Sequence, residues 1–117
     1  MMKNLLTLFL LLLVSFANYG QETDKSLNIE SVITISNISA YPNPFKDKTL
    51  ITFRSSAVQN VYFEVKNILG KQIYTLHLVA KKGTNEILFS KNNLERGMYI
   101  YTIQADSEVI SKRLVVR

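Results

Sequence analysis

The residues that could perform acid–base chemistry in this sequence do not form a recognisable catalytic pattern. His77 is the only histidine among the 117 residues, and it lies inside an apolar, strand-like segment. A general base needs an orienting partner and a nucleophile within reach, and no motif of the sequence supplies both to His77. We therefore expect His77 to be a core or sheet-face residue and not a catalytic base.

The carboxylates are equally uninformative, because they are scattered among basic residues. They include Glu64, Glu86, Glu95, Asp106 and Glu108. Neither the matched acid and base of a glycosidase nor the dense Asp/Asn/Gly loop of a calcium site is recognisable among them. The sequence also has no GxSxG, HExxH or phosphate-loop motif and no cysteine nucleophile. We therefore expect neither an enzyme nor a cofactor or metal site.

The charge pattern argues against nucleic-acid binding. The formal net charge is +5, from 14 Lys and Arg against 9 Asp and Glu. The cations are spread thinly along the chain and interrupted by acidic residues, whereas a nucleic-acid site presents a basic stripe within a recognisable motif. We therefore expect solvated charges and no nucleic-acid partner.

Residues 1–20 have the pattern of a secretory signal peptide. Lys3 supplies a positive charge, residues 5–14 are almost entirely apolar, and Ser15 and Ala17 are small residues suited to cleavage after residue 17 or 20. The apolar run is too short for a comfortable membrane span and no second run follows, so we expect an exported chain without a stable membrane span. The absence of cysteine excludes the acylated cysteine of a bacterial lipoprotein.

From residue 49 onward the sequence predicts short strands bounded by turns. The strand-like segments are 49–55, 61–68, 72–80, 86–90, 98–105 and 109–117. Gly70 supplies the positive φ that a tight hairpin requires. Without cysteine, the roughly one hundred mature residues must be held by one ordinary hydrophobic core. We expect an all-β fold, a small antiparallel β-sandwich of the immunoglobulin-like kind with about seven short strands in one domain.

Both prolines of the chain lie in the segment YPNPF, residues 41–45. Each proline fixes its own φ and biases the preceding residue towards extended geometry, so the segment is stiff and cannot begin a helix. Residues 21–40, which precede it, are rich in Ser, Thr and Asn and have apolar residues at positions 32, 33 and 35. We expect 21–40 to be a linker or an edge strand and 41–117 to be the folded domain.

Four sequence elements carry a resemblance to a known family. They are YPNP, a glycine–basic pair in a central turn, an L-x-x-G-x-Y element and a basic–aliphatic final strand. The residues concerned are Tyr41, Pro42, Asn43 and Pro44; Gly70 and Lys71; Leu94, Gly97 and Tyr99; and Lys112, Arg113, Leu114, Val115 and Val116. In this order, over residues 40–117, they resemble the type A C-terminal sorting domain of the type IX secretion system of Bacteroidetes.

The resemblance implies that the chain carries a sorting signal and does not catalyse a reaction. Proteins of this family cross the inner membrane with a signal peptide, and the outer-membrane translocon then recognises the folded domain in the periplasm. A surface protease of the system usually removes the domain, and the cargo is released or attached at the surface. The implied partners are the translocon and this protease, and the implied location is the periplasm in transit, then the cell surface or the extracellular medium.

The sequence leaves open what is being sorted. Only residues 21–40 separate the predicted signal peptide from YPNPF, so the chain is a very small exported protein, the remnant of a longer gene, or a domain with its own extracellular function. An alternative of another class is a secreted β-sandwich that binds carbohydrate or a cell-surface partner through Tyr62, Tyr74, Tyr99 and Tyr101. Because tyrosines at alternate strand positions are more often packing residues, the sorting function is favoured.

Overall fold

Seven strands make up most of residues 33–117, the part of the chain that the computed structural model describes. They are β1 (Ile35–Tyr41), β2 (Lys48–Ser55), β3 (Gln59–Asn67), β4 (Gln72–Ala80), β5 (Gly83–Ser90), β6 (Gly97–Gln104) and β7 (Val109–Val116). Each segment predicted from residue 49 onward corresponds to one strand, and β1 precedes the prolines. The predicted signal peptide lies outside the described residues.

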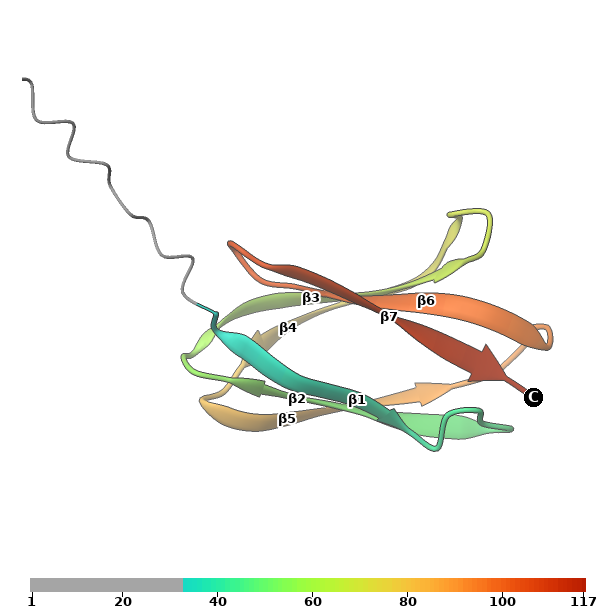
Figure 1. The fold of residues 1–117 in the computed structure, drawn as a ribbon, viewed down its shortest axis with the longest axis horizontal. Helices are drawn as coiled ribbons and strands as arrows, with labels where there is room; N and C mark the ends of the chain where they lie inside the picture. The colour runs from blue at the N-terminus through green and yellow to red at the C-terminus, as the bar shows by residue number, and fades with distance from the viewer. Residues whose placement is uncertain (1–32) are drawn as a thin grey trace, which may run out of the picture. The chain divides into compact units, whose positions relative to one another are not determined.

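The strands form two antiparallel sheets that pack face to face, as the two layers of Figure 1 show. One sheet has the order β1-β2-β5 and the other the order β4-β3-β6-β7. The chain crosses between the sheets after β2, β4 and β5, which is the arrangement of an immunoglobulin-like sandwich. The predicted all-β sandwich is therefore confirmed.

The core lies between the sheets and is built from the alternating apolar residues of each strand. In β3, Val61, Phe63 and Val65 are all 0% exposed, because every second side chain of a strand points to the same face. Phe63 lies at the centre of an aromatic group. Its ring centroid is between 6.0 and 6.3 Å from those of Tyr74, Phe89 and Tyr101. Aromatic packing across the two sheets thus replaces the disulfide that the chain lacks.

β1 reaches the core through a bulge. Ile35 and Ile38 are both buried, although a spacing of three places two residues on opposite faces of a regular strand. The pairing of β1 with β2 shifts register between Ser36 and Ser39, and Asn37 has a φ of 52°. Asn tolerates this left-handed conformation better than most residues, and the extra residue returns Ile38 to the core face. The folded domain therefore begins before the prolines.

Replacing Phe63 by Ala should lower the free energy of unfolding by about 3–5 kcal/mol, because it leaves a cavity at the centre of the aromatic group. Urea unfolding followed by circular dichroism measures the change. Tyr62→Ala is the matched control, since its side chain is on the opposite face of β3 and is 53% exposed. Equal losses for the two variants would contradict this account of the core.

Burial raises the pKa of Tyr101 above its ordinary value of 10.0. The folded state then holds the phenol proton more tightly than the unfolded state, so this contribution to stability is complete below pH 10.0 and is lost as pH rises through the folded-state pKa. Tyr101→Phe keeps the ring and removes the titrating group. Urea midpoints compared at about pH 9 and about pH 11 should therefore fall less in Tyr101→Phe than in the unchanged protein. An identical fall of the urea midpoint in both proteins would contradict the raised pKa of Tyr101.

Candidate recognition surface

The four sequence elements meet at one end of the sandwich, which we call the motif end. This end carries the loop 42–47 between β1 and β2, the hairpin turn 68–71, the loop 91–96 and the last residues of β7. Figure 1 shows these connections on the side of the C-terminus, whereas the β2–β3, β4–β5 and β6–β7 connections lie at the opposite end. The fold therefore gathers elements that are widely separated in the sequence.

Asn43 of the YPNP element is hydrogen-bonded to the backbone of the last strand. Its Nδ2 donates to the carbonyl oxygen of Arg113 at 3.0 Å, and its Oδ1 accepts from the amide of Val115 at 2.9 Å. A primary amide offers both a donor and an acceptor, so Asn43 satisfies two outward-facing groups of β7 as a neighbouring strand would. The first and the last of the four elements are thus physically joined.

Phe45 continues this pairing along β7. Its amide donates to the carbonyl oxygen of Val115 at 3.0 Å, and its carbonyl oxygen accepts from the amide of Arg117 at 2.8 Å, which forms a short parallel bridge. The Phe45 ring is 1% exposed and packs edge-on against Phe89, with centroids 6.1 Å apart. The loop is therefore anchored both to an edge strand and in the core.

The prolines are held at the surface of the same loop. The buried hydroxyl of Thr49 donates to the carbonyl oxygen of Pro42 at 2.7 Å, and both X-Pro peptide bonds of the loop are cis. Pro42 and Pro44 are exposed, and Tyr41 is 81% exposed. YPNP consequently presents a partly apolar surface next to the end of β7.

β7 is integrated in its sheet. It pairs with β6 along its whole length. Leu114 and Val116 are buried in the core, whereas Arg113 is exposed. Lys112 reaches towards the other sheet, where its Nζ donates to the carbonyl oxygen of Ile38 at the β1 bulge at 2.7 Å. The final basic–aliphatic element therefore holds the sandwich together and is not a free strand.

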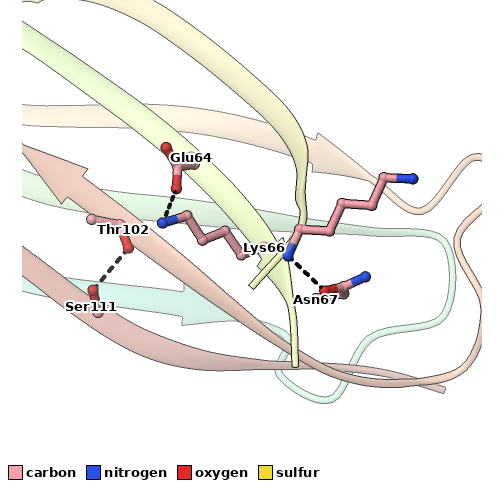
Figure 2. A network of polar contacts seen from close by, with 6 residues as sticks. Glu64, Lys66, Asn67, Thr102 and Ser111 are labelled. Atoms are coloured by element: carbon pink, nitrogen blue, oxygen red, sulfur yellow. Dashed lines mark hydrogen bonds and ion pairs between the residues drawn. The ribbon is translucent and has the colours of Figure 1, made fainter. Parts of the chain in front are cut away.

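Gly70 and Lys71 close the hairpin between β3 and β4. Gly70 has a φ of 84°, which residues with a side chain adopt only at a cost. The Asn67 Oδ1 accepts from the amides of Leu69 and Lys71 at 3.0 and 2.9 Å, and Figure 2 shows Asn67 making one of these bonds. This Asx-type bonding braces the turn from inside.

The L-x-x-G-x-Y element fixes the loop before β6. The hydroxyl of Tyr99, a residue that is 8% exposed, donates to the carbonyl oxygen of Glu95 at 2.7 Å. Leu94 packs partly buried against the core, and its amide donates to the carbonyl oxygen of Lys91 at 2.9 Å. Gly97 has a φ of 148°, a conformation that L side chains rarely adopt. These motif residues therefore shape the loop.

Two of the hollows on the surface of the motif end bring together segments that are far apart in the sequence. A hollow of about 650 Å³ brings Lys71 together with Leu94, Gly97 and Tyr99, so the second and third elements share it. A second hollow, of about 550 Å³, lies between the loop 42–47 and the end of β7. Arg96 lines both hollows.

Several residues of this surface were missed by the sequence motifs. Asn67 could have been found, because an Asn just before a glycine turn is a common brace. Lys46, Lys91 and Arg96 belong to no motif, yet they line the second hollow. They lie in two loops far apart in the sequence, so no local signal marks them as neighbours.

The outer face of the four-stranded sheet mixes polar side chains with exposed apolar ones such as Val79 and Ile100. Figure 2 shows the Glu64–Lys66 ion pair on this face, with Nζ and Oε1 2.9 Å apart. His77 is exposed there, stacked on Tyr62 with centroids 4.6 Å apart, and its Nε2 lies 3.2 Å from Asn60 Oδ1. Of the two placements predicted for His77, core or sheet face, the structure therefore shows the sheet face.

Within residues 33–117 there is also no cluster of three or more His, Cys, Asp or Glu side chains placed to bind a metal ion. In the same part of the chain we find no helix with the length and hydropathy needed to cross a bilayer.

The tyrosines of the alternative carbohydrate-binding function do not share a surface. Tyr99 and Tyr101 are 8% and 1% exposed, so they are packing residues, as the favoured interpretation predicts, and cannot form part of an exposed platform. Tyr74 packs edge-on against Phe89 at 5.3 Å, on the core side of β4. Tyr62 remains on the outer face, without a second exposed tyrosine beside it among the described residues.

Replacing Asn43 by Ala should lower the free energy of unfolding by about 1–3 kcal/mol, because two backbone groups of β7 lose their partner. Asn43→Asp keeps an acceptor for the Val115 amide but turns a carboxylate oxygen towards the carbonyl of Arg113. Amide hydrogen exchange at Val115 should therefore be faster in Asn43→Ala than in Asn43→Asp. Asn60→Ala is the matched control, since the Asn60 side chain bonds only to His77. Unchanged exchange at Val115 in Asn43→Ala would show that the Asn43 side chain does not stabilise the backbone of β7.

The comparison with protein families agrees with this arrangement. A family model described as the secretion system C-terminal sorting domain matches residues 39–117, more than half of the chain. The match includes all four sequence elements and the strands β2 to β7. No curated protein matches the chain. The chain therefore belongs to the family of C-terminal sorting domains of the type IX secretion system.

Proposed function

We propose that residues 33–117 are the signal that directs export across the outer membrane through the type IX translocon, and that the domain itself is not catalytic. The observation that carries the proposal is the meeting of all four family elements at the motif end. A sorting signal needs a distinctive surface and no reacting groups, and the motif end has this character.

The proposed route begins with the signal peptide at residues 1–20, which takes the chain to the periplasm. The domain then folds without disulfides, because the chain contains no cysteine. The outer-membrane translocon recognises it there and passes it to the cell surface or the medium. A surface protease of the system is the second proposed partner.

We further propose that the translocon reads the folded surface and not an extended terminal peptide. Leu114 and Val116 are buried, and the outer side of β7 between Arg113 and Arg117 is occupied by Asn43 and Phe45. Addition of this segment to a partner sheet would require both sets of contacts to break. Recognition of the intact end requires neither.

The test is export of a reporter fusion that carries a signal peptide, a fluorescent protein and residues 31–117. In a host with a working type IX system, we expect the reporter at the surface or in the medium, and in a strain without the translocon we expect it in the periplasm. A reporter that remains periplasmic in both strains would contradict the proposed sorting function.

A second fusion, starting at residue 41, distinguishes recognition of a linear motif from recognition of a folded surface. It retains all four elements but lacks β1, whose Ile35 and Ile38 are buried. We expect this fusion to be exported much less efficiently, because the domain is destabilised by the loss of two core residues. Equal export of both fusions would show that the folded surface is not what the translocon reads.

A further inference from the structure

Cations gather at the motif end without an ion-pair partner among residues 33–117. The second hollow is lined by the basic residues Lys46, Lys91, Arg96 and Arg117, and Asp47 contributes an acidic side chain. Among the described residues the single ion pair joins Lys66 to Glu64, which lie on the outer face of the sheet. The cations of the hollow are therefore available to an external anionic group.

The walls of this hollow are held in place by backbone hydrogen bonds. The amide of Lys91 donates to the carbonyl oxygen of Asp47 at 2.8 Å, which joins the loop 91–96 to the loop 42–47. The amide of Arg117 donates to the carbonyl oxygen of Phe45 at 2.8 Å, which joins the end of β7 to the same loop. Three segments thus hold the cationic residues near one another before any ligand arrives, and such preorganisation lowers the cost of binding.

Apolar side chains surround the neighbouring hollow. Ile68 and Leu69 at the tip of the hairpin turn are 65% and 89% exposed, and Met98 at the start of β6 is 47% exposed. Arg96 lies between this apolar group and the cationic hollow, since it lines both. Exposed apolar residues next to unpaired cations are typical of a surface that binds another protein.

We infer that a segment of a translocon protein docks across the two hollows, with carboxylates on the cationic side and apolar side chains on Ile68, Leu69 and Met98. The inference rests on the proposed sorting function and names the chemistry of its partner. An acidic and apolar protein segment complements both hollows together. A phosphorylated lipid headgroup would complement the cations alone and leave the apolar hollow without a role.

The double charge reversal Lys91→Glu/Arg96→Glu in the 31–117 reporter fusion tests the inference. Its matched control is Lys81→Glu/Lys82→Glu, which makes the same change in charge at two exposed residues of the opposite end. We expect the first variant to be exported at least about tenfold more slowly than the control, because the introduced carboxylates repel those of the partner and slow association. Circular dichroism and urea unfolding of both variants check that they fold.

The possible outcomes separate this inference from the sorting function. If the unchanged fusion is exported only when the translocon is present and Lys91→Glu/Arg96→Glu matches its control, the sorting function stands and the docking site is wrong. If the unchanged fusion is not exported, the sorting function itself fails. Leu69→Ser should also slow export, and an unchanged rate for this variant would reject the apolar half of the site.

Carbodiimide coupling provides a direct readout, since it joins lysine amines to carboxylates in contact. With the chain from residue 21 to residue 117 and purified translocon, we expect cross-links from Lys46 or Lys91 to Asp or Glu of a translocon protein, and none from Lys81 or Lys82. Binding to phosphatidylglycerol vesicles that Lys91→Glu/Arg96→Glu abolishes, without any such cross-link, would replace the protein partner by a lipid surface and overturn the inference.

Discussion

The pairing of the outer edge of β7 is the constraint on which the motif end depends. β7 is the last strand of its sheet, so one side of its backbone has no neighbouring strand. Such an edge leaves amides and carbonyls available for pairing with other chains. Asn43 and Phe45 occupy this side from Arg113 to Arg117. One side-chain amide and one backbone segment thereby close the edge at the C-terminal half of the strand.

The same contacts place the surrounding loops. The loop 42–47 is bonded to β7 through Phe45 and to the loop 91–96 through the Asp47–Lys91 backbone bond. The hairpin turn 68–71 is braced separately by Asn67 and meets the loop 91–96 at the first hollow. This surface exists only in the folded domain, because no single segment contains it. That dependence is compatible with our proposal that the translocon selects folded domains.

The family motif combines residues with different physical roles. Tyr99, Leu114 and Val116 are buried and determine packing, whereas Gly70 and Gly97 permit backbone conformations that other residues resist. A third group faces solvent and is free to contact a partner; it comprises Tyr41, Pro42, Pro44, Lys71 and Arg113. Sequence similarity weights these groups alike, and only burial and hydrogen bonding separate the residues that build the surface from those that present it.

The sequence by itself determined the strands after residue 49 and the family, because alternating apolar residues, turn glycines and motif order are local properties of the chain. It left residues 21–40 as a linker or an edge strand. The bulge at Asn37 puts Ile35 and Ile38, which face the same side, three positions apart, and this spacing does not fit the period of two that identifies a strand. Only the tertiary structure decided which side chains meet at the motif end. Lys91 meets the loop 42–47 because β2 pairs with β5 and Lys48 lies opposite Ser90. The end of β7 belongs to the other sheet, so its approach to the same loop depends on how the two sheets close on each other, and no local pattern encodes either contact.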